Sequence, residues 1–143
     1  MFIGEYKHTI DEKGRVAVPV KFRGKLSEGV VITRGLDNCL FVYSLTEWDK
    51  IAQQLADMPL SQTNARAFSR LMLAGAMEAE IDRQGRIIIP NYLRSFASIS
   101  KNVVMAGLYN RIEVWDEKNW QEYQKKNESE VENIAEKLTD WGI

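Results

Sequence analysis

The chain has 143 residues, of which 45% are hydrophobic and 27% are charged, the composition of one ordinary globular domain or two very small ones. Its 19 Lys and Arg residues against 20 Asp and Glu residues give a net charge of −1, which excludes a uniformly basic surface. Nucleic acid could therefore be bound only through a local basic patch. The single Cys39 excludes a disulfide framework within one chain, and the single histidine excludes most His-rich metal sites.

No segment has the pattern of a membrane helix or a targeting signal. The longest unbroken apolar stretch, residues 71–77, is far shorter than the ~20 residues that a membrane helix needs. Glu5 interrupts the basic-then-apolar order of a signal peptide. We therefore expect a soluble protein of a reducing intracellular compartment.

An internal repeat dominates the sequence. Residues 9–23 recur, 71 residues later, as residues 80–94. The matching pairs are Ile10 and Ile81, Asp11 and Asp82, Gly14 and Gly85, Arg15 and Arg86, Pro19 and Pro90, and Arg23 and Arg94. Further matches, up to Trp48 and Trp120, extend the units to about residues 1–51 and 72–123. We interpret the chain as an internal duplication.

Each unit has the same predicted elements in chain order. In the first unit, strands are predicted over 6–10, 15–18, 30–33 and 40–43, turns over 11–14 and 35–38, and a short helix from Pro19 to about residue 26. The Ser44-Leu-Thr-Glu47 spacing predicts a helix start with a capping box.

Apolar residues at helical spacing predict three helices that each have one buried face. They consist of Trp48, Ile51, Ala52 and Leu55; of Ala65, Phe68, Leu71 and Met72; and of Val131, Ile134, Ala135 and Leu138.

The predicted organisation is a first repeat at 1–56, a connecting helix at 57–71, a second repeat at 72–125 and an acidic C-terminal helix at 126–143. A unit of about fifty residues is marginal as an independent domain. The two units are therefore expected to interleave into one α+β core related by a pseudo-two-fold axis, with peripheral helices.

The paired turns are the most informative candidates for a functional site. Each has an Asp, a Gly and an Arg at the start of the next strand, and Lys13 and Arg83 add one further cation to each turn. Arginine can donate two hydrogen bonds to guanine or to a phosphate. The surrounding segments 1–25 and 66–94 carry net charges of +3 and +2, whereas the tail 126–143 carries −3. A solvated hairpin end, in which each Arg pairs with its own Asp, fits the same residues.

The remaining turn residues are expected to organise the backbone. Asp11 and Asp82 can accept backbone N–H bonds, and Gly14 and Gly85 can adopt a positive φ angle. A catalytic role for the two aspartates is the less favoured reading.

These motifs resemble a known family. The hairpin Asp-Glu-Lys-Gly-Arg-Val-Ala-Val-Pro and its repeat Asp-Arg-Gln-Gly-Arg-Ile-Ile-Ile-Pro are similar to those of the MraZ family of bacterial transcriptional regulators. The start Met1-Phe-Ile-Gly-Glu-Tyr, the segment 33–40 and the Glu113-Val-Trp115 strand share this resemblance, which covers nearly the whole chain.

The resemblance implies a duplicated, swapped-hairpin, AbrB-like β-barrel. It implies one DNA-facing loop of Asp11, Lys13, Gly14 and Arg15, and a partner loop of Asp82, Arg83, Gly85 and Arg86. It also implies a ring-shaped homo-oligomer, often an octamer, that associates with the nucleoid. Its expected partner is double-stranded promoter DNA with short direct repeats, upstream of the division and cell-wall gene cluster.

An enzyme is the first alternative. His8 lies in an alternating strand, Asp11 and Asp82 could form a carboxylate pair, and Ser98 with Lys101 matches a Ser-x-x-Lys pattern without its companion motifs. No nucleotide-binding glycine motif is present, and Cys39 is predicted to be a buried thiol. We therefore expect no catalytic residue, cofactor, metal or small-molecule substrate, and no membrane contact.

An oligomeric scaffold or an AbrB-like antitoxin that binds a protein partner is the second alternative. Trp48 and Trp120 are predicted to anchor the core, whereas residues 127–143 could bind a partner. The duplication argues against the antitoxin, because such proteins usually carry one hairpin unit.

Overall fold

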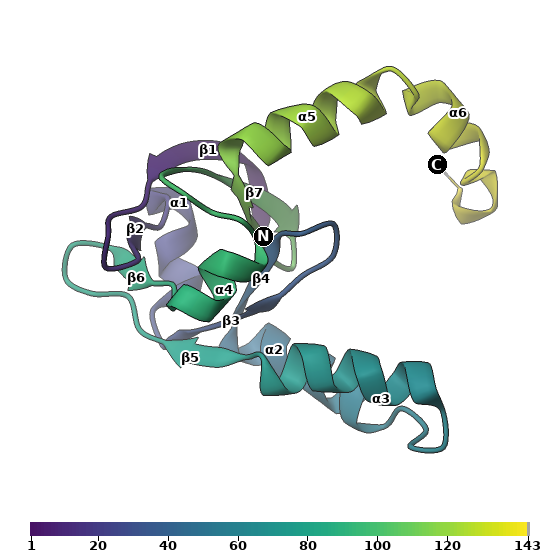
Figure 1. The fold of residues 1–143 in the computed structure, drawn as a ribbon, viewed down its shortest axis with the longest axis horizontal. Coiled ribbons are helices and arrows are strands. Elements are labelled where there is room, and N and C mark those ends of the chain that lie inside the picture. The colour runs from purple at the N-terminus through teal and green to yellow at the C-terminus, as the bar shows by residue number, and fades with distance from the viewer. Residues whose placement is uncertain (143) are drawn as a thin grey trace.

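A six-stranded antiparallel sheet forms the body of the computed structural model, which describes residues 1–142 (Figure 1). Its strands, in spatial order, are β1 (Phe2–Thr9), β7 (Asn102–Tyr109), β8 (Ile112–Asp116), β4 (Leu40–Ser44), β3 (Val30–Arg34) and β5 (Met77–Ala79). A separate two-stranded sheet pairs β2 (Arg15–Ala17) with β6 (Arg86–Ile88). The expected α+β class is confirmed.

Each strand of one repeat has a hydrogen-bonded neighbour from the other repeat. β1 pairs along its whole length with β7, from Phe2 opposite Tyr109 to Thr9 opposite Asn102. β3 pairs with β5, β4 with β8, and β2 with β6. Within residues 1–142, β1 and β5 remain at the two edges of the larger sheet, so strand pairing does not close it into the expected barrel.

The main core is built from both repeats. Its fully buried side chains include Val16, Leu26, Ile87, Ile89 and Leu93. Pro19 and Pro90 immediately precede the short helices α1 (Val20–Arg23) and α4 (Asn91–Phe96), and a 3-10 turn, η1 (Gly24–Leu26), continues α1. Proline suits a helix start because its missing N–H has no partner there. The core residues of each repeat cover those of the other, so neither set would stay buried alone.

A second apolar cluster lies beneath the longer helices. Cys39, Phe41, Leu55, Met72 and Trp115 are buried in it, with Trp48 and Trp120 packed on it half-buried. The Cys39 thiol donates to the carbonyl oxygen of Leu36 at 3.1 Å, and burial raises its pKa. The predicted buried thiol is confirmed.

Helix α2 (Leu45–Ala56) begins as the capping box predicts, because the Ser44 hydroxyl accepts a hydrogen bond from the Glu47 N–H at 3.2 Å. The next helix, α3 (Thr63–Ser69), continues into a π-helical turn, η2 (Arg70–Ala74). Leu71 was expected on the buried face, but it is 49% exposed. The wider π turn shifts the helical register, which turns Leu71 outward.

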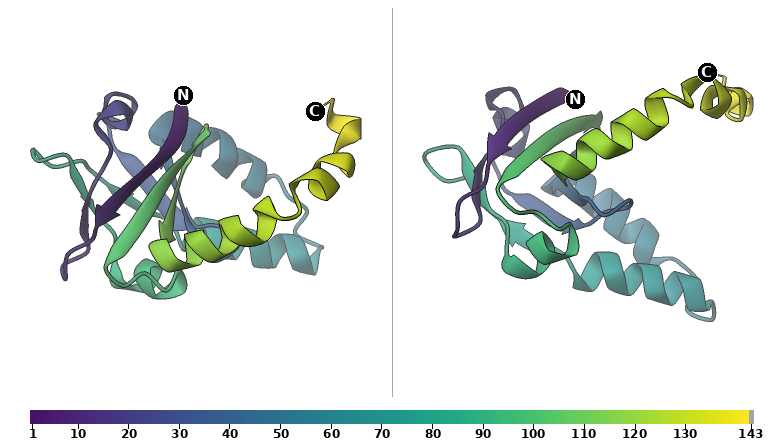
Figure 2. Two further views of the ribbon diagram at one scale, coloured as in Figure 1. Left: turned by 90° about the horizontal axis from the view of Figure 1, so that it is seen from above. Right: turned by 45° about the horizontal axis from the view of Figure 1, so that its top comes forward.

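The C-terminal helices are α5 (Glu117–Glu128), α6 (Val131–Glu136) and a 3-10 turn, η3 (Thr139–Trp141). The apolar face of Val131, Ile134, Ala135 and Leu138 was expected to be buried, but all four residues are exposed. Within residues 1–142, no element covers this face, because α5 carries it away from the sheet (Figure 2). No helix among the described residues is long and apolar enough to cross a membrane.

Candidate nucleic-acid interface

The first candidate loop, residues 11–15, joins β1 to β2. The Gly14 N–H donates to the Asp11 carbonyl oxygen at 3.0 Å, and the Asp11 N–H donates to the Arg15 carbonyl oxygen at 3.0 Å. Gly14 has a φ of +85°, a conformation that favours glycine. These local bonds make a tight turn that ends with Arg15 at the start of β2.

The Asp11 carboxylate fixes this turn. Its Oδ1 accepts from the N–H groups of Lys13 at 3.0 Å and Arg15 at 2.9 Å, and its Oδ2 accepts from Arg15 Nε at 2.7 Å. The backbone hydrogen bond of Arg15 is the main cause that lowers the pKa of Asp11; burial opposes it, and the hydrogen bond and charge of the Arg15 side chain lower the pKa further. The carboxylate therefore stays ionised at neutral pH. Asp11 therefore makes the backbone hydrogen bonds that a loop organiser requires, and its role stays a prediction.

The second loop, residues 82–86, has the same network. Asp82 Oδ1 accepts from the N–H groups of Gln84 at 2.8 Å and Arg86 at 2.9 Å, and Oδ2 accepts from Arg86 Nε at 3.0 Å. The Gly85 N–H donates to the Asp82 carbonyl oxygen at 3.0 Å, with Gly85 at a φ of +77°. The Arg86 backbone N–H is the main cause of the lowered Asp82 pKa. The duplication therefore extends to individual hydrogen bonds.

Backbone hydrogen bonds connect the two loops. The Val18 N–H donates to the Gly85 carbonyl oxygen at 2.8 Å, and the Ile89 N–H donates to the Gly14 carbonyl oxygen at 2.8 Å. Between these bonds, Val16 lies opposite Ile87 in the small sheet. Both loops project from the same side of the molecule, and the helices α2, α3, α5 and α6 extend from the other side (Figures 1 and 2).

Both loop arginines keep hydrogen-bonding capacity for a ligand. Arg15 and Arg86 use Nε on their own aspartates, and their side chains are 34% and 32% exposed. The terminal Nη groups make no hydrogen bond within residues 1–142, so the planar guanidinium can still donate to an acceptor outside the chain. The predicted Asp–Arg pairing and an external contact are thus compatible.

The two additional cations occupy different positions of the loops. Lys13 corresponds to Gln84 in the second loop, and Arg83 corresponds to Glu12 in the first. Lys13 and Arg83 are both exposed. The candidate interface therefore carries four cations on a repeated backbone, but their arrangement is not repeated.

Sequence reasoning gave no role to Arg23 and Arg94, which lie directly behind the loops. Arg23 Nε donates to the Val18 carbonyl oxygen at 2.7 Å, and Arg94 Nη1 donates to the Glu12 carbonyl oxygen at 3.4 Å. The sequence does show that the two arginines match between the repeats. This match alone could not indicate which backbone groups they contact.

The structure shows the contacts of three of the enzyme candidates. Asp11 and Asp82 each bind the arginine of their own loop. His8 is half-buried in β1, where burial and the nearby Arg23 lower its pKa, and its Nε2 has no hydrogen-bond partner within residues 1–142. Over the same residues, no group of three or more potential metal ligands comes together.

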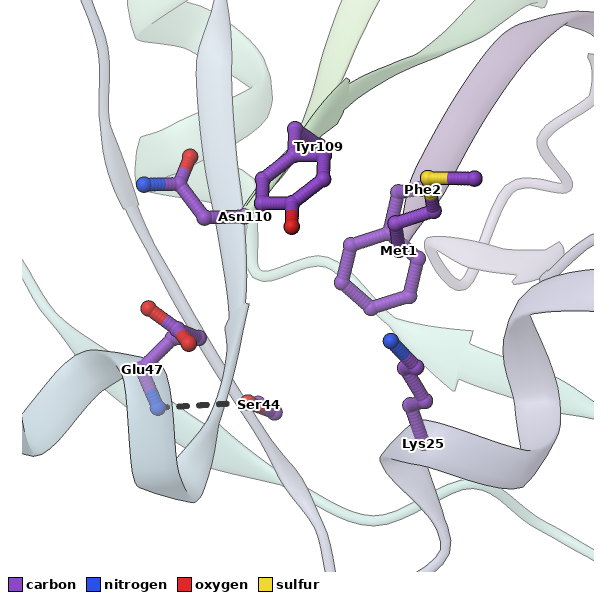
Figure 3. A pocket seen from close by; sticks show the side chains of 7 residues that line it. All are labelled: Met1, Phe2, Lys25, Ser44, Glu47, Tyr109 and Asn110. Atoms are coloured by element: carbon purple, nitrogen blue, oxygen red, sulfur yellow. Dashed lines mark hydrogen bonds between the residues drawn. The ribbon is translucent and has the colours of Figure 1, made fainter.

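A cavity of about 430 Å³ lies at the start of β1, at the opposite end of this strand from the 11–15 loop. Met1, Phe2, Lys25, Tyr109 and Glu47 are among the residues that line it (Figure 3). Ser44, also in the lining, is already engaged as the cap of α2. The cavity is therefore separate from the candidate interface.

Comparison with known proteins identifies close relatives. The family model described as "MraZ protein, putative antitoxin-like" matches residues 1–71 and again residues 72–141. Proteins named "Transcriptional regulator MraZ" from Natranaerobius thermophilus, Caldanaerobacter subterraneus subsp. tengcongensis and Thermoanaerobacter pseudethanolicus are 50%, 52% and 52% identical to the chain. In each comparison, the alignment covers 143 residues and the full length of both proteins.

Proposed function

The chain belongs to the MraZ family, and we propose that it is a transcriptional regulator that binds specific promoter DNA through its paired Asp-x-x-Gly-Arg loops. The observation that carries this proposal is the shared loop geometry. In each loop, an aspartate holds its arginine through Nε and leaves the terminal Nη groups available. Arg15 and Arg86 contact DNA, and Lys13 and Arg83 contribute further positive charge beside them.

Arginine is suited to this task. Its planar guanidinium can donate two parallel hydrogen bonds to O6 and N7 of guanine in the major groove, or to a phosphate. An arginine that is already oriented by a carboxylate loses less conformational freedom on binding. Asp11 and Asp82 thus organise the loops without contacting DNA.

The two repeats form a swapped-hairpin, AbrB-like arrangement with pseudo-two-fold symmetry. The reciprocal hydrogen bonds of Val18 with Gly85 and of Ile89 with Gly14 support this description, as does the pairing of β2 with β6. In such an arrangement, the two loops present related surfaces at one end of the chain.

Binding is strengthened by assembly of several subunits into a ring-shaped homo-oligomer, an octamer in the simplest case. A good bidentate contact contributes about 1–3 kcal/mol of base discrimination, which is modest for one subunit. Subunits that contact successive direct repeats about one helical turn apart raise the effective concentration of every further loop. The bound ring limits access of RNA polymerase to promoters upstream of division and cell-wall genes, in the cytoplasm at the nucleoid.

The test is fluorescence anisotropy with purified full-length protein and labelled DNA from upstream of its own gene. A duplex with the same base composition and scrambled repeats is the control. Preferential binding to the native duplex, weakening with added salt, supports the proposal. Equal affinity for both duplexes would leave only a nonspecific cationic surface.

The exposed C-terminal face favours a second function, the binding of a protein partner. Trp120, Tyr123, Val131 and Ile134 contribute to an apolar groove of about 340 Å³ between α5 and α6. This groove lies on the C-terminal helices α5 and α6, which extend away from the loops (Figure 2). A scaffold or antitoxin-like function would require it, so a folded protein that binds neither duplex would favour this alternative.

A further inference from the structure

Two arginines that do not belong to the loops lie at matching positions behind them. Arg23 is the last residue of α1, and Arg94 lies in α4. Both are half-buried, whereas Lys21 on the same helix as Arg23 is exposed. Neither arginine forms a salt bridge within residues 1–142, so their burial has another explanation.

Arg23 contacts the loop of the opposite repeat. Its guanidinium lies so close to the backbone of Gly85 that a Cβ atom at this glycine would overlap it. Its Nε donates to the Val18 carbonyl oxygen, and the Val18 N–H donates to the Gly85 carbonyl oxygen at 2.8 Å. The backbone of Val18 therefore joins Arg23 to the second loop.

Arg94 makes the reciprocal contact with the first loop. A Cβ atom at Gly14 would lie 3.2 Å from Arg94 Cζ, so this guanidinium lies against Gly14. Arg94 Nη1 also donates to the Glu12 carbonyl oxygen at 3.4 Å, and the Ile89 N–H donates to the Gly14 carbonyl oxygen at 2.8 Å. Each loop thus receives an arginine from the other repeat.

We propose that Arg23 and Arg94 are positioning residues that hold the loop of the opposite repeat in its binding geometry. Glycine has a second purpose at positions 14 and 85, because the absence of a side chain lets a flat guanidinium approach the backbone. Each loop is therefore supported by one arginine of the opposite repeat, and removing that arginine loosens the opposite loop alone. This coupling rests on the contacts above, and only its consequence for DNA rests on the proposed function.

The test is hydrogen–deuterium exchange of the free full-length protein, followed in peptides that cover residues 11–15 and 82–86. In Arg23→Ala, we expect the amides of 82–86 to exchange about five- to tenfold faster, with a much smaller change in 11–15. In Arg94→Ala, the pattern should reverse. Lys21→Ala, which removes a neighbouring exposed cation, is the matched control and should change neither loop.

Two results would overturn the proposal. One is faster exchange only in the loop of the mutated repeat, and the other is unchanged exchange in both loops. Arg23→Lys keeps the charge and most of the side chain, so it serves where the alanine variant does not fold. Lysine lacks the planar group, and the same crossed pattern is therefore expected.

DNA binding separates positioning from direct contact. Arg23→Ala should weaken specific binding several-fold while the slope of log K against log salt stays unchanged, whereas Arg86→Ala should reduce that slope by about one. A reduced slope in Arg23→Ala would make Arg23 a DNA contact and contradict the assigned role. If the wild-type protein binds no specific duplex, the proposed function fails, but the exchange experiment still decides whether the loops are supported from the opposite repeat.

Discussion

The two loops have the same backbone hydrogen bonds but differ in their two central side chains. In residues 11–15 and 82–86, the aspartate accepts the same set of hydrogen bonds from the main chain and from the arginine. At the third position, the bond to aspartate comes from a backbone N–H, of Lys13 in one loop and Gln84 in the other. The side chain at this position is consequently free to vary without cost to the turn.

The difference in side chains changes the charge that each loop presents. Glu12 and Lys13 leave the first loop with no net charge, whereas Arg83 and Gln84 give the second loop a net charge of +1. Aspartate, glycine and arginine thus set the loop geometry, and the two central residues set the charge that the loop presents to a ligand. Substitutions of the shared residues test the loop geometry, and substitutions of the differing residues test the charge.

Removing the shared arginines should have the largest effect. Arg15→Ala and Arg86→Ala should each weaken specific DNA binding by about 1–3 kcal/mol per contact, and the double variant should lose sequence preference altogether. Anisotropy titrations on native and scrambled duplexes measure this effect. Lys137→Ala, which changes an exposed residue directly after α6, is the control. Retained preference in the double variant would contradict the assignment of both loops.

The shared glycines should differ in how much folding free energy they contribute. A Cβ at Gly14 would overlap the carbonyl oxygen of Ile89, which is backbone, whereas at Gly85 it would meet the movable Arg23 side chain. With the cost of a positive φ, we expect Gly14→Ala to lower the free energy of unfolding by about 3 kcal/mol and Gly85→Ala by about 1 kcal/mol. Chemical denaturation measures both values, and a larger loss in Gly85→Ala would refute this reading of the contacts.

Exchanging the differing residues should have a smaller effect on affinity. Glu12→Arg gives the first loop the charge pattern of the second and should tighten DNA binding a few-fold. Arg83→Glu should weaken it and reduce the salt slope by about one. Salt-dependent titrations measure the change. If Glu12→Arg weakened DNA binding and Arg83→Glu strengthened it, the loops would not face the DNA backbone.

The smallest expected effect is a pH dependence of stability that comes from a residue of the first repeat alone. His8 in β1 corresponds to Ala79 in the second repeat. Burial, followed by the positive charge of Arg23, lowers the pKa of His8. The folded chain therefore binds this proton more weakly than the unfolded chain. Titration of His8 should therefore leave the free energy of unfolding unchanged above the ordinary histidine pKa of ~6.5. It should lower that free energy as the pH falls below this value.

Thermal unfolding at pH 7.5 and pH 5 tests this prediction. In His8→Ala, the midpoint should fall less between the two pH values than in the wild type. An equal fall in both proteins would assign the pH dependence to other groups. The loop aspartates do not interfere in this range, because their pKa values are lowered from an ordinary value that is already below pH 5.

The turns and helix starts could be predicted because they depend on residues close together in the sequence. Asp11 bonds to groups two and four residues away, and Ser44 caps a helix three residues later. Pattern alone also indicated that Cys39 is buried. The predicted boundaries at 1–56, 57–71, 72–125 and 126–143 stay predictions, as does DNA contact by Lys13, Arg15, Arg83 and Arg86.

Other features depend on distant parts of the chain. The contact of Arg94 with Glu12 spans 82 residues and exists only because β2 pairs with β6. Periodicity identified an apolar face on residues 131–138 but could not indicate that it is left uncovered. The exposure of Leu71 follows from a π turn, which a regular helical period does not predict. Likewise, matching strands indicated interleaving but not the open edges at β1 and β5.

Disulfide crosslinking to DNA tests most directly whether the loops face the promoter. Cysteine is placed at Lys13 or Gln84, and at Lys137, directly after α6, as a matched control. Each variant is then mixed with a duplex that carries a thiol-tethered base in one of its direct repeats. Cys39 is buried with a raised pKa, so the wild-type background does not compete. We predict rapid crosslinks from Lys13→Cys and Gln84→Cys to the native duplex only. Equally fast crosslinking of Lys137→Cys, or no loop crosslink in a protein that binds the duplex, would contradict the assignment of the loops.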